Sequence, residues 1–536
     1  MPITYTATQY EPFEWPLSGA AAPDAPHTLD VDVVVSGRDG TWRVPAFWSG
    51  GGEWRVRFAA PAPGTYSWRS ECSDPSVAGV HGAEGELRVV PYGGDNPLYA
   101  RGPLTVADDR RTFRHADGTP FLWYGDTWWM GFTKRLSWPD GFDELAADRV
   151  AKGFTLVQIV AGVYPDMPWA DPRGANEAGL PYDEELDEPN PAWWDLADLK
   201  VRALVRHGLV PCVVGCWGYY ATVFGEEKMK RHWRHIVARW GAYPVVWCLA
   251  GEGAMPYYLS DTPQEDAAHQ RTSWTGIARY VREIDPMGRL VTIHPTQAGR
   301  EQVDDDTVLD FDMLQTGHDG RTAIGNSVRR IAESRAKDPA MPVVVGEVIY
   351  EGIMHESDAE KLRLVWWASM LSGAGGFTYG ANGLWQFNEP DNPYGASPHG
   401  ATWGNTPWRE AAQLPGSREL GFSTRFLSRF EWHRMEAHPE WIDPPAADDD
   451  YHAVYAAGVP GEFRLCYFYR LILPWSKDPR PRLVGLETDR DWTALWFDPR
   501  TGAEYEIGPV EPQPDGSWEV PLTPEMKDYV LALRAR

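Results

Sequence analysis

The chain has 536 residues, which is longer than one ordinary domain and suits two or three. Its formal net charge of −26 and its pI of about 4.9 exclude nucleic acid and anionic membranes as expected partners. Its 28 Trp and 23 Tyr supply flat aromatic faces of the kind that stack on sugar rings, although sheet and barrel cores also use Trp. Composition therefore favours carbohydrate as the partner, and a homo-oligomer is compatible with it.

The first residues of the chain contain neither a basic segment nor a long apolar run. We therefore expect no signal peptide and a cytoplasmic protein. No stretch reaches the length of a transmembrane helix. The five cysteines are scattered, three of them in apolar runs, which predicts buried free thiols. Cys212 and Cys216 share a strand face, but no further ligands converge there, so we expect no metal and no cofactor.

Residues 1–94 have the pattern of β structure. Apolar and polar residues alternate in short runs, such as 29–35 and 53–58, which end at turns rich in Gly or Pro. Short strands at this regular spacing predict an N-terminal β-sandwich. A similar series of β runs begins near residue 448 and predicts a C-terminal β-sandwich at 441–536.

Between these regions, at 95–440, apolar strand-like runs alternate with helical stretches. Helix 192–207, for example, carries an apolar stripe and is followed by Gly208. Eight strand candidates occur in this region, the number that closes a (β/α)8 TIM barrel. The predicted fold class is therefore α/β, a TIM barrel flanked by two β-sandwich domains. The candidates are residues 121–129, 155–163, 209–215, 244–253, 289–295, 309–318, 342–347 and 375–380.

Two of the predicted strands end in the same dipeptide, Gly251-Glu252 on the fourth and Gly346-Glu347 on the seventh. The C-terminal ends of barrel strands are where this fold carries its chemistry. Two carboxyl groups that face each other across the barrel mouth can cleave a glycosidic bond. The pattern therefore predicts a glycosidase, with two solvated loop acids as the alternative interpretation.

Several motifs occur in an order that resembles a known family. They are Tyr124-Gly-Asp-Thr-Trp, Ile293-His-Pro, Gln315-Thr-Gly-His, Gly346-Glu-Val-Ile-Tyr-Glu-Gly and Gly373-Ala-Gly-Gly-Phe-Thr-Tyr-Gly. Over about residues 98–435 the chain resembles the apiosidase-like glycoside hydrolases, which are family 140-like with a clan A type of barrel. The resemblance implies that Glu252 is the acid/base and Glu347 the nucleophile. It also fits the flanking domains, the second of which would be of collagen-binding type. Strand four departs from the family, which usually carries Gly-Asp where this chain has Gly251-Glu252.

Physical chemistry favours the same two roles. Glu252 has apolar sequence neighbours, which should raise its pKa and keep its proton. Glu347 should stay ionised and accept a hydrogen bond from Tyr379 or His318. Glu351 is a rival nucleophile or a substrate ligand, although a supporting position is favoured. The candidate substrate-binding residues end barrel strands or follow them, and they are Asp126, Trp128, Trp129, Trp217, His294, Gln315, His318, Tyr350, Glu351, Tyr379 and Trp385.

We therefore expect a retaining glycoside hydrolase. Long loops at 164–191 and 386–408 should close one end of the cleft, which favours exo action on small glycosides or oligosaccharides. Furanosides such as apiosides or arabinofuranosides are candidate substrates. A non-catalytic carbohydrate-binding or adhesion protein on a degenerate barrel is the alternative function. His232 and His235 are spaced i, i+3 on a predicted helix, where a solvated face is favoured over a metal site.

Overall fold

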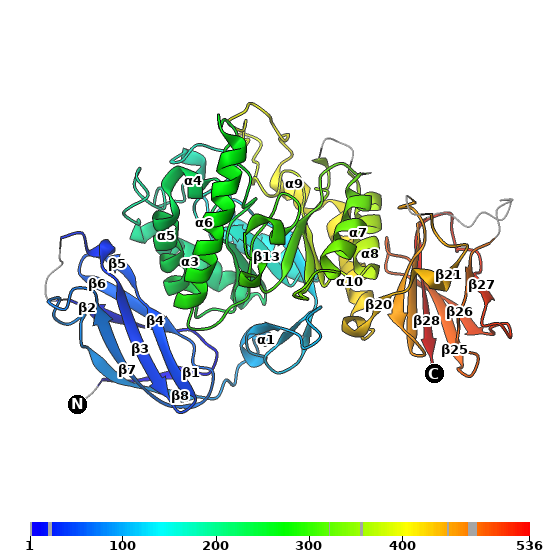
Figure 1. The fold of residues 1–536 in the computed structure, drawn as a ribbon, viewed down its shortest axis with the longest axis horizontal. Coiled ribbons are helices and arrows are strands. Elements are labelled where there is room, and N and C mark those ends of the chain that lie inside the picture. The colour runs from blue at the N-terminus through cyan, green and yellow to red at the C-terminus, as the bar shows by residue number, and fades with distance from the viewer. Residues whose placement is uncertain (1–2, 20–23, 321, 354–356, 448–449, 470–479) are drawn as a thin grey trace.

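The computed structural model describes residues 3–19, 24–320, 322–353, 357–447, 450–469 and 480–536. Figure 1 shows three bodies along the long axis: an N-terminal sheet domain, a central barrel surrounded by helices, and a C-terminal sheet domain. The predicted fold class is confirmed. The exact domain limits at 94/95 and 440/441 stay predictions. Within the described ranges, no helix is both long and apolar enough to span a bilayer.

The N-terminal domain consists of two sheets around one core. Along β3, Val31, Val33 and Val35 are buried, and Trp15 and Trp54 of the other sheet belong to the same apolar cluster. The alternation in the sequence therefore buries one face of each sheet, as in a β-sandwich. The larger sheet has the order β1 (Ile3–Thr8), β8 (Glu84–Val90), β7 (Gly64–Cys72), β3 (Val31–Gly37) and β4 (Gly40–Pro45), and the smaller has β2 (Phe13–Ser18), β6 (Glu53–Phe58) and β5 (Phe47–Gly50).

A short connecting segment leads from this domain to the barrel. It contains α1 (Pro97–Ala100) and the sheet of β9 (Leu104–Val106), β10 (Phe113–His115) and β11 (Pro120–Phe121). Phe113 of β10 contacts Trp123, at the start of the first barrel strand, and Phe311, just before the sixth, with ring centroids 5.6 and 5.1 Å apart. The connecting segment therefore covers the N-terminal end of the barrel, the end that serves stability in this fold.

The central domain contains eight parallel strands, and all eight sequence candidates contribute one. In sheet order the strands are β16, β15, β14, β13, β12, β19, β18 and β17. The first and last barrel strands along the chain, β12 and β19, therefore pair with each other. Every residue of these strands is buried, which explains their continuous apolar runs. The strands are β12 (Trp123–Thr127), β13 (Leu156–Val160), β14 (Val210–Val214), β15 (Val246–Cys248), β16 (Val291–Thr292), β17 (Asp312–Gln315), β18 (Val343–Glu347) and β19 (Gly376–Tyr379).

Helices surround these strands (Figure 1). In α3, Asn190 caps the N-terminus by accepting from the amides of Ala192 and Trp193, and Pro191 occupies the first turn, where its missing N–H costs nothing. Gly208, with a φ of +81°, follows the end of this helix as predicted. The helices are α2 (Asp140–Ala151), α3 (Pro191–Arg206), α4 (Tyr220–Phe224), α5 (Glu226–Trp240), α6 (Pro263–Ile284), α7 (Thr322–Arg335), α8 (Ala359–Leu371), α9 (Trp408–Ala412) and α10 (Pro415–Leu427).

The prediction of a solvated face for His232 and His235 is wrong. The His232 ring nitrogens lie 2.9 Å from the Tyr182 hydroxyl and 2.7 Å from the Gly215 carbonyl oxygen. The His235 ring packs against Trp194, with centroids 4.7 Å apart, and against Phe47 of the N-terminal domain. Helix α5 lies between the barrel and the N-terminal domain, so both histidines are covered.

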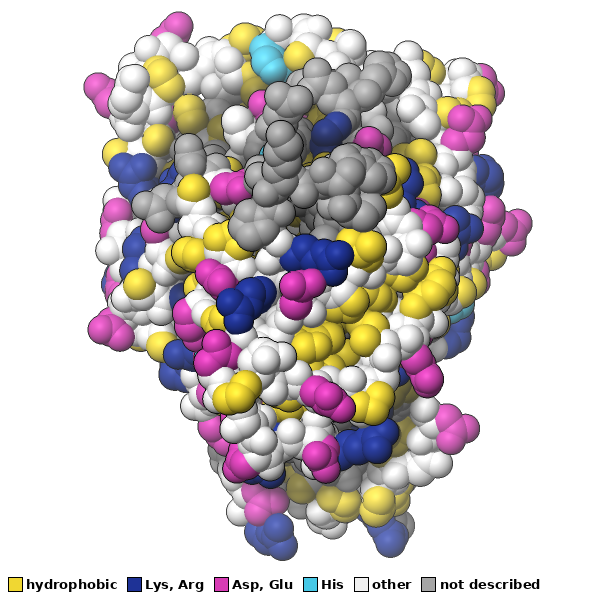
Figure 2. All heavy atoms as spheres, turned by 90° about the vertical axis from the view of Figure 1, so that its right-hand side faces the viewer, with side chains coloured by type: hydrophobic (Ala, Val, Ile, Leu, Met, Phe, Trp, Pro, Cys, Tyr) yellow, Lys and Arg dark blue, Asp and Glu magenta, His cyan; other side chains and the backbone are white. Residues whose placement is uncertain are grey.

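The C-terminal domain also contains two sheets around an apolar core. Figure 2 views this end of the molecule, where acidic and basic side chains are interspersed with apolar ones. On its barrel side, the Arg363 guanidinium of α8 binds both carboxylate oxygens of Asp528 at 2.8 Å. The strands are β20 (Glu436–Ala437), β22 (Tyr455–Val459), β23 (Phe463–Phe468), β28 (Tyr529–Ala535), β25 (Trp492–Phe497) and β26 (Glu504–Val510) in one sheet, and β21 (Ile442–Asp443), β24 (Arg482–Leu483) and β27 (Trp518–Glu519) in the other.

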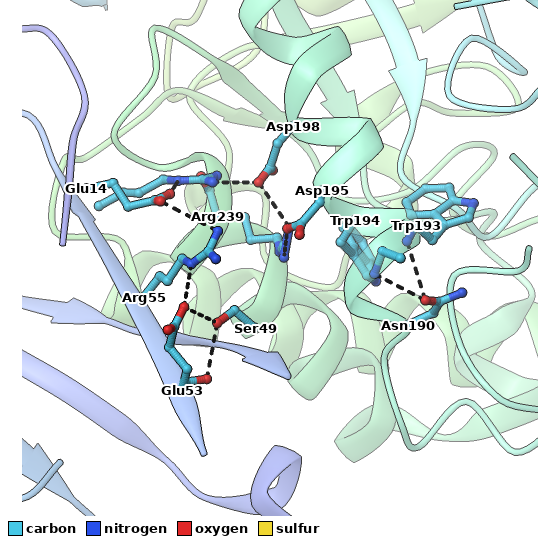
Figure 3. Close-up of polar contacts among 12 residues, drawn as sticks. Glu14, Ser49, Glu53, Arg55, Asn190, Trp193, Trp194, Asp195, Asp198 and Arg239 are labelled. Atoms are coloured by element: carbon cyan, nitrogen blue, oxygen red, sulfur yellow. Dashed lines mark hydrogen bonds and ion pairs between the residues drawn. The ribbon is translucent and has the colours of Figure 1, made fainter. Parts of the chain in front are cut away.

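A buried charge cluster joins the N-terminal domain to the barrel. Asp198 of α3 lies 2.5 Å from the Arg57 guanidinium of β6 and 3.0 Å from that of Arg239 on α5. Arg57 also reaches Glu14 of β2, at 2.7 Å. Figure 3 shows Glu14 on the sheet side and Asp195, Asp198 and Arg239 on the helix side of this junction. Asp198 is therefore the buried carboxylate that two buried arginines share.

We expect Asp198→Ala to lower the free energy of unfolding by about 3–5 kcal/mol, because two buried guanidinium groups would lose the buried carboxylate that they share. Burial alone would raise the pKa of Asp198, but Arg239 and Arg57 lower this pKa to about 2. A lowered folded-state pKa stabilises the protein above the normal carboxyl pKa, and this contribution disappears as the pH falls towards 2. Urea unfolding at pH 7 and below pH 4 measures both effects.

Asp195→Ala is the matched control, because Asp195 contacts the same Arg239 but its side chain is 46% exposed. Asp195→Ala should lower the free energy of unfolding by less than about 1 kcal/mol. Equal losses for the two variants would show that burial of the cluster does not determine its contribution.

Candidate active site

A cavity of about 340 Å³ lies at the C-terminal ends of the barrel strands. Small-molecule sites typically occupy roughly 300–1,000 Å³, and in TIM barrels they lie at this end. The cavity contains both predicted catalytic residues. Its lining residues are Trp129, Pro165, Asp166, Trp217, Glu252, Met255, Tyr258, Gln315, His318, Glu347, Tyr350, Ile353, Trp385, His399 and Trp403.

Glu347 is the last residue of β18, and its side chain is 7% exposed. One carboxylate oxygen lies 3.2 Å from Nε2 of His294, and the other lies 3.2 Å from Nε2 of His318. Burial by itself raises the pKa of a carboxyl group, but these imidazoles lower the pKa of Glu347 to about 2. In return, Glu347 raises the pKa of His318 against the opposing effect of burial. Glu347 is therefore ionised at neutral pH, and His318 is one of its partners, as predicted.

Glu252 follows β15 in a left-handed backbone conformation, with a φ of +46°. This conformation is rare for residues other than Gly and is often found at functional sites. The neighbouring strand end approaches closely, because a Cβ on Gly218 would lie 2.5 Å from the Glu252 carbonyl oxygen. Burial, followed by the charge of Glu347, raises the pKa of Glu252. The pKa values of the two carboxyl groups are thus shifted in opposite directions. The shifts favour the protonated acid for Glu252 and the carboxylate for Glu347.

Gln315 bridges the two acids from the end of β17. Its side-chain nitrogen lies 3.0 Å from Oε1 of Glu252 and 3.4 Å from Oε1 of Glu347. These two oxygens are therefore at most 6.4 Å apart, the sum of the two distances. Trp217 donates to the other oxygen of Glu252 at 3.2 Å. The amide and the indole thus hold the Glu252 side chain against the pocket wall.

Aromatic side chains form much of the remaining lining. Trp129 donates to the Tyr350 hydroxyl at 3.1 Å, and the His318 ring stacks on Tyr350 with centroids 5.2 Å apart. Gly380, after β19, permits this position, because a Cβ there would lie 2.0 Å from the Tyr350 ring. Together with Trp217 and Trp385, these rings give the cavity an aromatic lining, which is the kind of surface that sugar rings stack on.

Asp126 and Trp128 do not line the cavity, so the prediction that they contact the substrate needs correction. Both side chains are fully buried. Asp126 accepts from Arg149 of α2 at 2.6 Å and from the Trp128 indole at 2.8 Å. The reason is strand register: Asp126 lies inside β12, where its side chain points towards the helix layer and not towards the barrel axis.

Glu351, Tyr379 and His294 also lie beneath the cavity and not on its surface. Tyr379 donates to Glu351 at 2.6 Å, so it is not the donor to Glu347 that was considered. Glu351 also accepts from the Gly416 amide at 3.0 Å, and burial raises its pKa to about 6. These contacts place Glu351 in a supporting layer, the position that the sequence favoured.

The sequence predicted that loops 164–191 and 386–408 close one end of the cleft, but it did not indicate which of their residues line the cavity. These are Asp166, His399 and Trp403, and Tyr258 joins them from a third loop. Asp166 lies in the acidic and aromatic loop after β13, whose many carboxylates concealed the relevant one. Tyr258 comes from the loop that follows Glu252, and its ring stacks on His399 with centroids 5.0 Å apart. Only the folded chain brings these three loops together.

The described residues contain no group of three or more His, Cys, Asp or Glu placed to share a metal ion. Cys72, Cys212, Cys216, Cys248 and Cys466 are all buried and free, as predicted.

Comparison with known proteins identifies the family. Residues 107–434 match the family described as "Apiosidase-like, catalytic domain", and residues 6–73 match a "Domain of unknown function (DUF5060)". No curated protein matches the chain. A solved glycoside hydrolase is similar with 21% identity and a TM-score of 0.67, over 82% of this chain and 98% of its own.

Two further solved structures come from Bacteroides vulgatus. One is a family 5 glycoside hydrolase with 21% identity and a TM-score of 0.67, over 82% of this chain and 94% of its own. The other, described provisionally as a glycoside hydrolase, has 16% identity and a TM-score of 0.70, over 99% of this chain and all of its own. At these identities the likeness shows the fold, whereas the family match spans more than half of the chain. The chain belongs to the apiosidase-like family and is a glycoside hydrolase.

Proposed function

We propose that this glycoside hydrolase acts with retention of configuration, by a double displacement in which Glu347 is the nucleophile and Glu252 the acid/base. The observation that carries the proposal is the Gln315 bridge, which limits the two carboxylate oxygens to 6.4 Å. Retaining enzymes hold their carboxyl groups about 5–5.5 Å apart, whereas inverting enzymes leave about 6.5–9.5 Å for a water molecule. The bridge therefore supports direct attack.

In the first step, a Glu347 oxygen forms a bond to the anomeric carbon while the bond to the leaving oxygen breaks. Glu252 gives its proton to that oxygen. In the second step, Glu252 takes a proton from water, the water oxygen bonds to the anomeric carbon, and the ester to Glu347 breaks. Each group thus returns to its starting protonation state.

The electrostatics of the pair suit this exchange of roles. The charge of Glu347 contributes to the raised pKa of Glu252 in the free enzyme. That charge disappears when Glu347 becomes an ester, so the pKa of Glu252 should fall in the intermediate. A group that begins as an acid then becomes a base at the same pH. The non-catalytic alternative has no need for two carboxyl groups with opposite pKa shifts at one cavity.

Loop contacts support action on the end of a glycan. The loop after β19 crosses to the loop after β13, where Tyr394 donates to the Pro165 carbonyl at 2.9 Å and Ser397 to Asp166 at 2.8 Å. These contacts close one side of the cavity, and a closed pocket accepts a terminal sugar more readily than an internal one. We therefore propose exo action, with furanosides such as apiosides or arabinofuranosides among the first substrates to try.

The experiment that tests the mechanism has two stages. A screen of 4-nitrophenyl pentosides and hexosides, furanose forms included, identifies a substrate. Proton NMR of the first minutes of its hydrolysis should then show the anomer of the substrate's own configuration, because a pair this close leaves no room for direct attack by water. An inverted first product would contradict the assigned pair, and complete inactivity on glycosides would contradict the proposed function.

A further inference from the structure

The third carboxyl group of the cavity is Asp166, which the two-carboxylate mechanism does not use. Asp166 is 9% exposed and lines the cavity together with Glu252 and Glu347. Its Oδ1 accepts from the Ser397 hydroxyl at 2.8 Å, and its backbone amide donates to the Tyr258 hydroxyl at 3.3 Å. A carboxylate offers about four acceptor sites, so acceptor capacity remains for a ligand.

Among the residues that the structure describes, Asp166 has no cationic partner. No described Lys, Arg or His lies within ion-pair distance of its carboxylate, whereas Asp171, five residues further, pairs with Arg173 at 2.8 Å. A nearly buried carboxylate without a counter-ion loses hydration and regains it only from hydrogen-bond donors. The cavity beside it is where a ligand can supply such donors.

The backbone holds this carboxylate in place before any ligand arrives. Asp166 has a φ of +56°, in the left-handed region that Asp tolerates better than most residues. The preceding residue, Pro165, is held by the Tyr394 hydroxyl, and Ser397 of the same crossing loop holds the Asp166 side chain. Binding therefore requires little reorganisation of this wall.

The charges around Asp166 restrict the chemistry of its ligand. The described lining contains three carboxyl groups and no Lys or Arg. Its imidazoles are His318, which is paired with Glu347, and His399, whose ring stacks on Tyr258. A sugar carboxylate in the pocket would meet like charges without a compensating cation, which works against its binding. Hydroxyl groups are donors and would complement the wall.

We infer that Asp166 is a specificity residue, which accepts hydrogen bonds from hydroxyl groups of the bound sugar and selects an uncharged sugar over a uronic acid. The inference rests on the proposed function in so far as this cavity is the site of hydrolysis. It adds that the cavity wall that contains Asp166 recognises the sugar through its hydroxyl groups. The Tyr258 and Ser397 hydroxyls position the carboxylate for that contact.

The kinetic test compares Asp166→Asn with Glu184→Gln, a charge-removing control in the same loop whose exposed side chain lies outside the cavity. On the aryl glycoside found in the screen, Asp166→Asn should lower kcat/KM by about 10- to 100-fold, the effect of losing hydrogen bonds to a charged group. Glu184→Gln should change it less than twofold. Identical kinetics for the two variants would overturn the inference.

A series of substrates distinguishes the proposed specificity role of Asp166 from a merely structural role. Monodeoxy forms of the same aryl glycoside each lack one hydroxyl group. The native enzyme should lose activity on the form that lacks the contacted hydroxyl, and Asp166→Asn should lose little more on that form than on the parent, because the contact is already absent. An Asp166→Asn penalty of equal size on every deoxy form would overturn the inference.

A binding experiment keeps the inference independent of turnover. Four Trp residues line the cavity, so intrinsic fluorescence can follow titration with neutral monosaccharides and with glucuronic and galacturonic acids. We expect at least tenfold tighter binding of a neutral sugar, with the preference reduced in Asp166→Asn. If the native protein hydrolyses nothing but shows this pattern, the proposed hydrolysis fails and the inference stands. Absence of any neutral-sugar preference overturns the inference even if hydrolysis is observed.

Discussion

Replacing Glu347 by glutamine is expected to lower kcat by ~10⁴-fold or more, the scale of loss when an enzyme is deprived of its nucleophile. The amide keeps the shape of the side chain and its place near His294 and His318, but it cannot form the ester. Steady-state hydrolysis of the aryl glycoside measures the loss. Circular dichroism and thermal unfolding confirm that the variant is folded.

Glu351→Gln is the matched control, because Glu351 lies four residues after Glu347 and is the rival nucleophile in the sequence. Its amide oxygen can still accept from Tyr379 and from the Gly416 amide, so activity should fall less than about tenfold. Loss of all activity in Glu351→Gln, with activity retained in Glu347→Gln, would reverse the assignment.

Azide identifies the face from which Glu347 attacks. Glu347→Ala leaves a space beside the anomeric carbon, where azide can bond in place of the carboxylate. An activated aryl glycoside should then yield a glycosyl azide of inverted configuration, because only one displacement occurs. A glycosyl azide of retained configuration would show that Glu347 is not the nucleophile.

Replacing Glu252 by alanine should produce a loss that depends on the leaving group. An alkyl glycoside needs a proton as its bond breaks, so kcat/KM should fall by about 10²–10⁴-fold, the usual contribution of general acid catalysis. A 2,4-dinitrophenyl glycoside releases a stable phenolate anion without a proton donor. Its rate of ester formation should therefore fall least. Equal losses on both substrates would contradict the acid role.

The pH dependence provides a second test of Glu252. Activity requires its protonated form, so the rate should fall as the pH rises through its pKa, which burial and Glu347 raise above the normal value. The acidic limb belongs to Glu347 and should lie far below neutrality, since its pKa is about 2. In Glu252→Ala, the alkaline limb should disappear for the dinitrophenyl substrate. Its persistence would assign that limb to another group, with His318 as the first candidate.

The sequence by itself determined the strand series and both candidate catalytic acids. Valine runs such as 343–345 are buried on both faces, and a Gly-Glu pair after such a run lies at the open end of the barrel because strand direction is the same throughout. These are local properties of periodicity and chain direction. They also placed Gln315 and His318 correctly at the cavity, since both end or follow a strand.

The register of the strands, which decides the face that each side chain occupies, could not be predicted from this local information. Asp126 and Gln315 both lie at strand ends in the sequence, but Asp126 faces Arg149 in the helix layer whereas Gln315 faces the two acids. A shift of one residue along a strand exchanges its two faces. The same limit applies to Tyr379, which contacts Glu351 and not Glu347.

Which residues form the wall that contains Asp166 was decided only by the tertiary structure. Asp166 and Ser397 are 231 residues apart, and Tyr258 comes from a third loop. Composition marks those loops as polar and aromatic, but it cannot say which side chains meet. Their meeting follows from closure of the barrel, which brings all βα loops to one rim. Closure depends on contacts between distant strands, so a pattern along the chain reveals the candidate catalytic acids but not which loop side chains meet beside them.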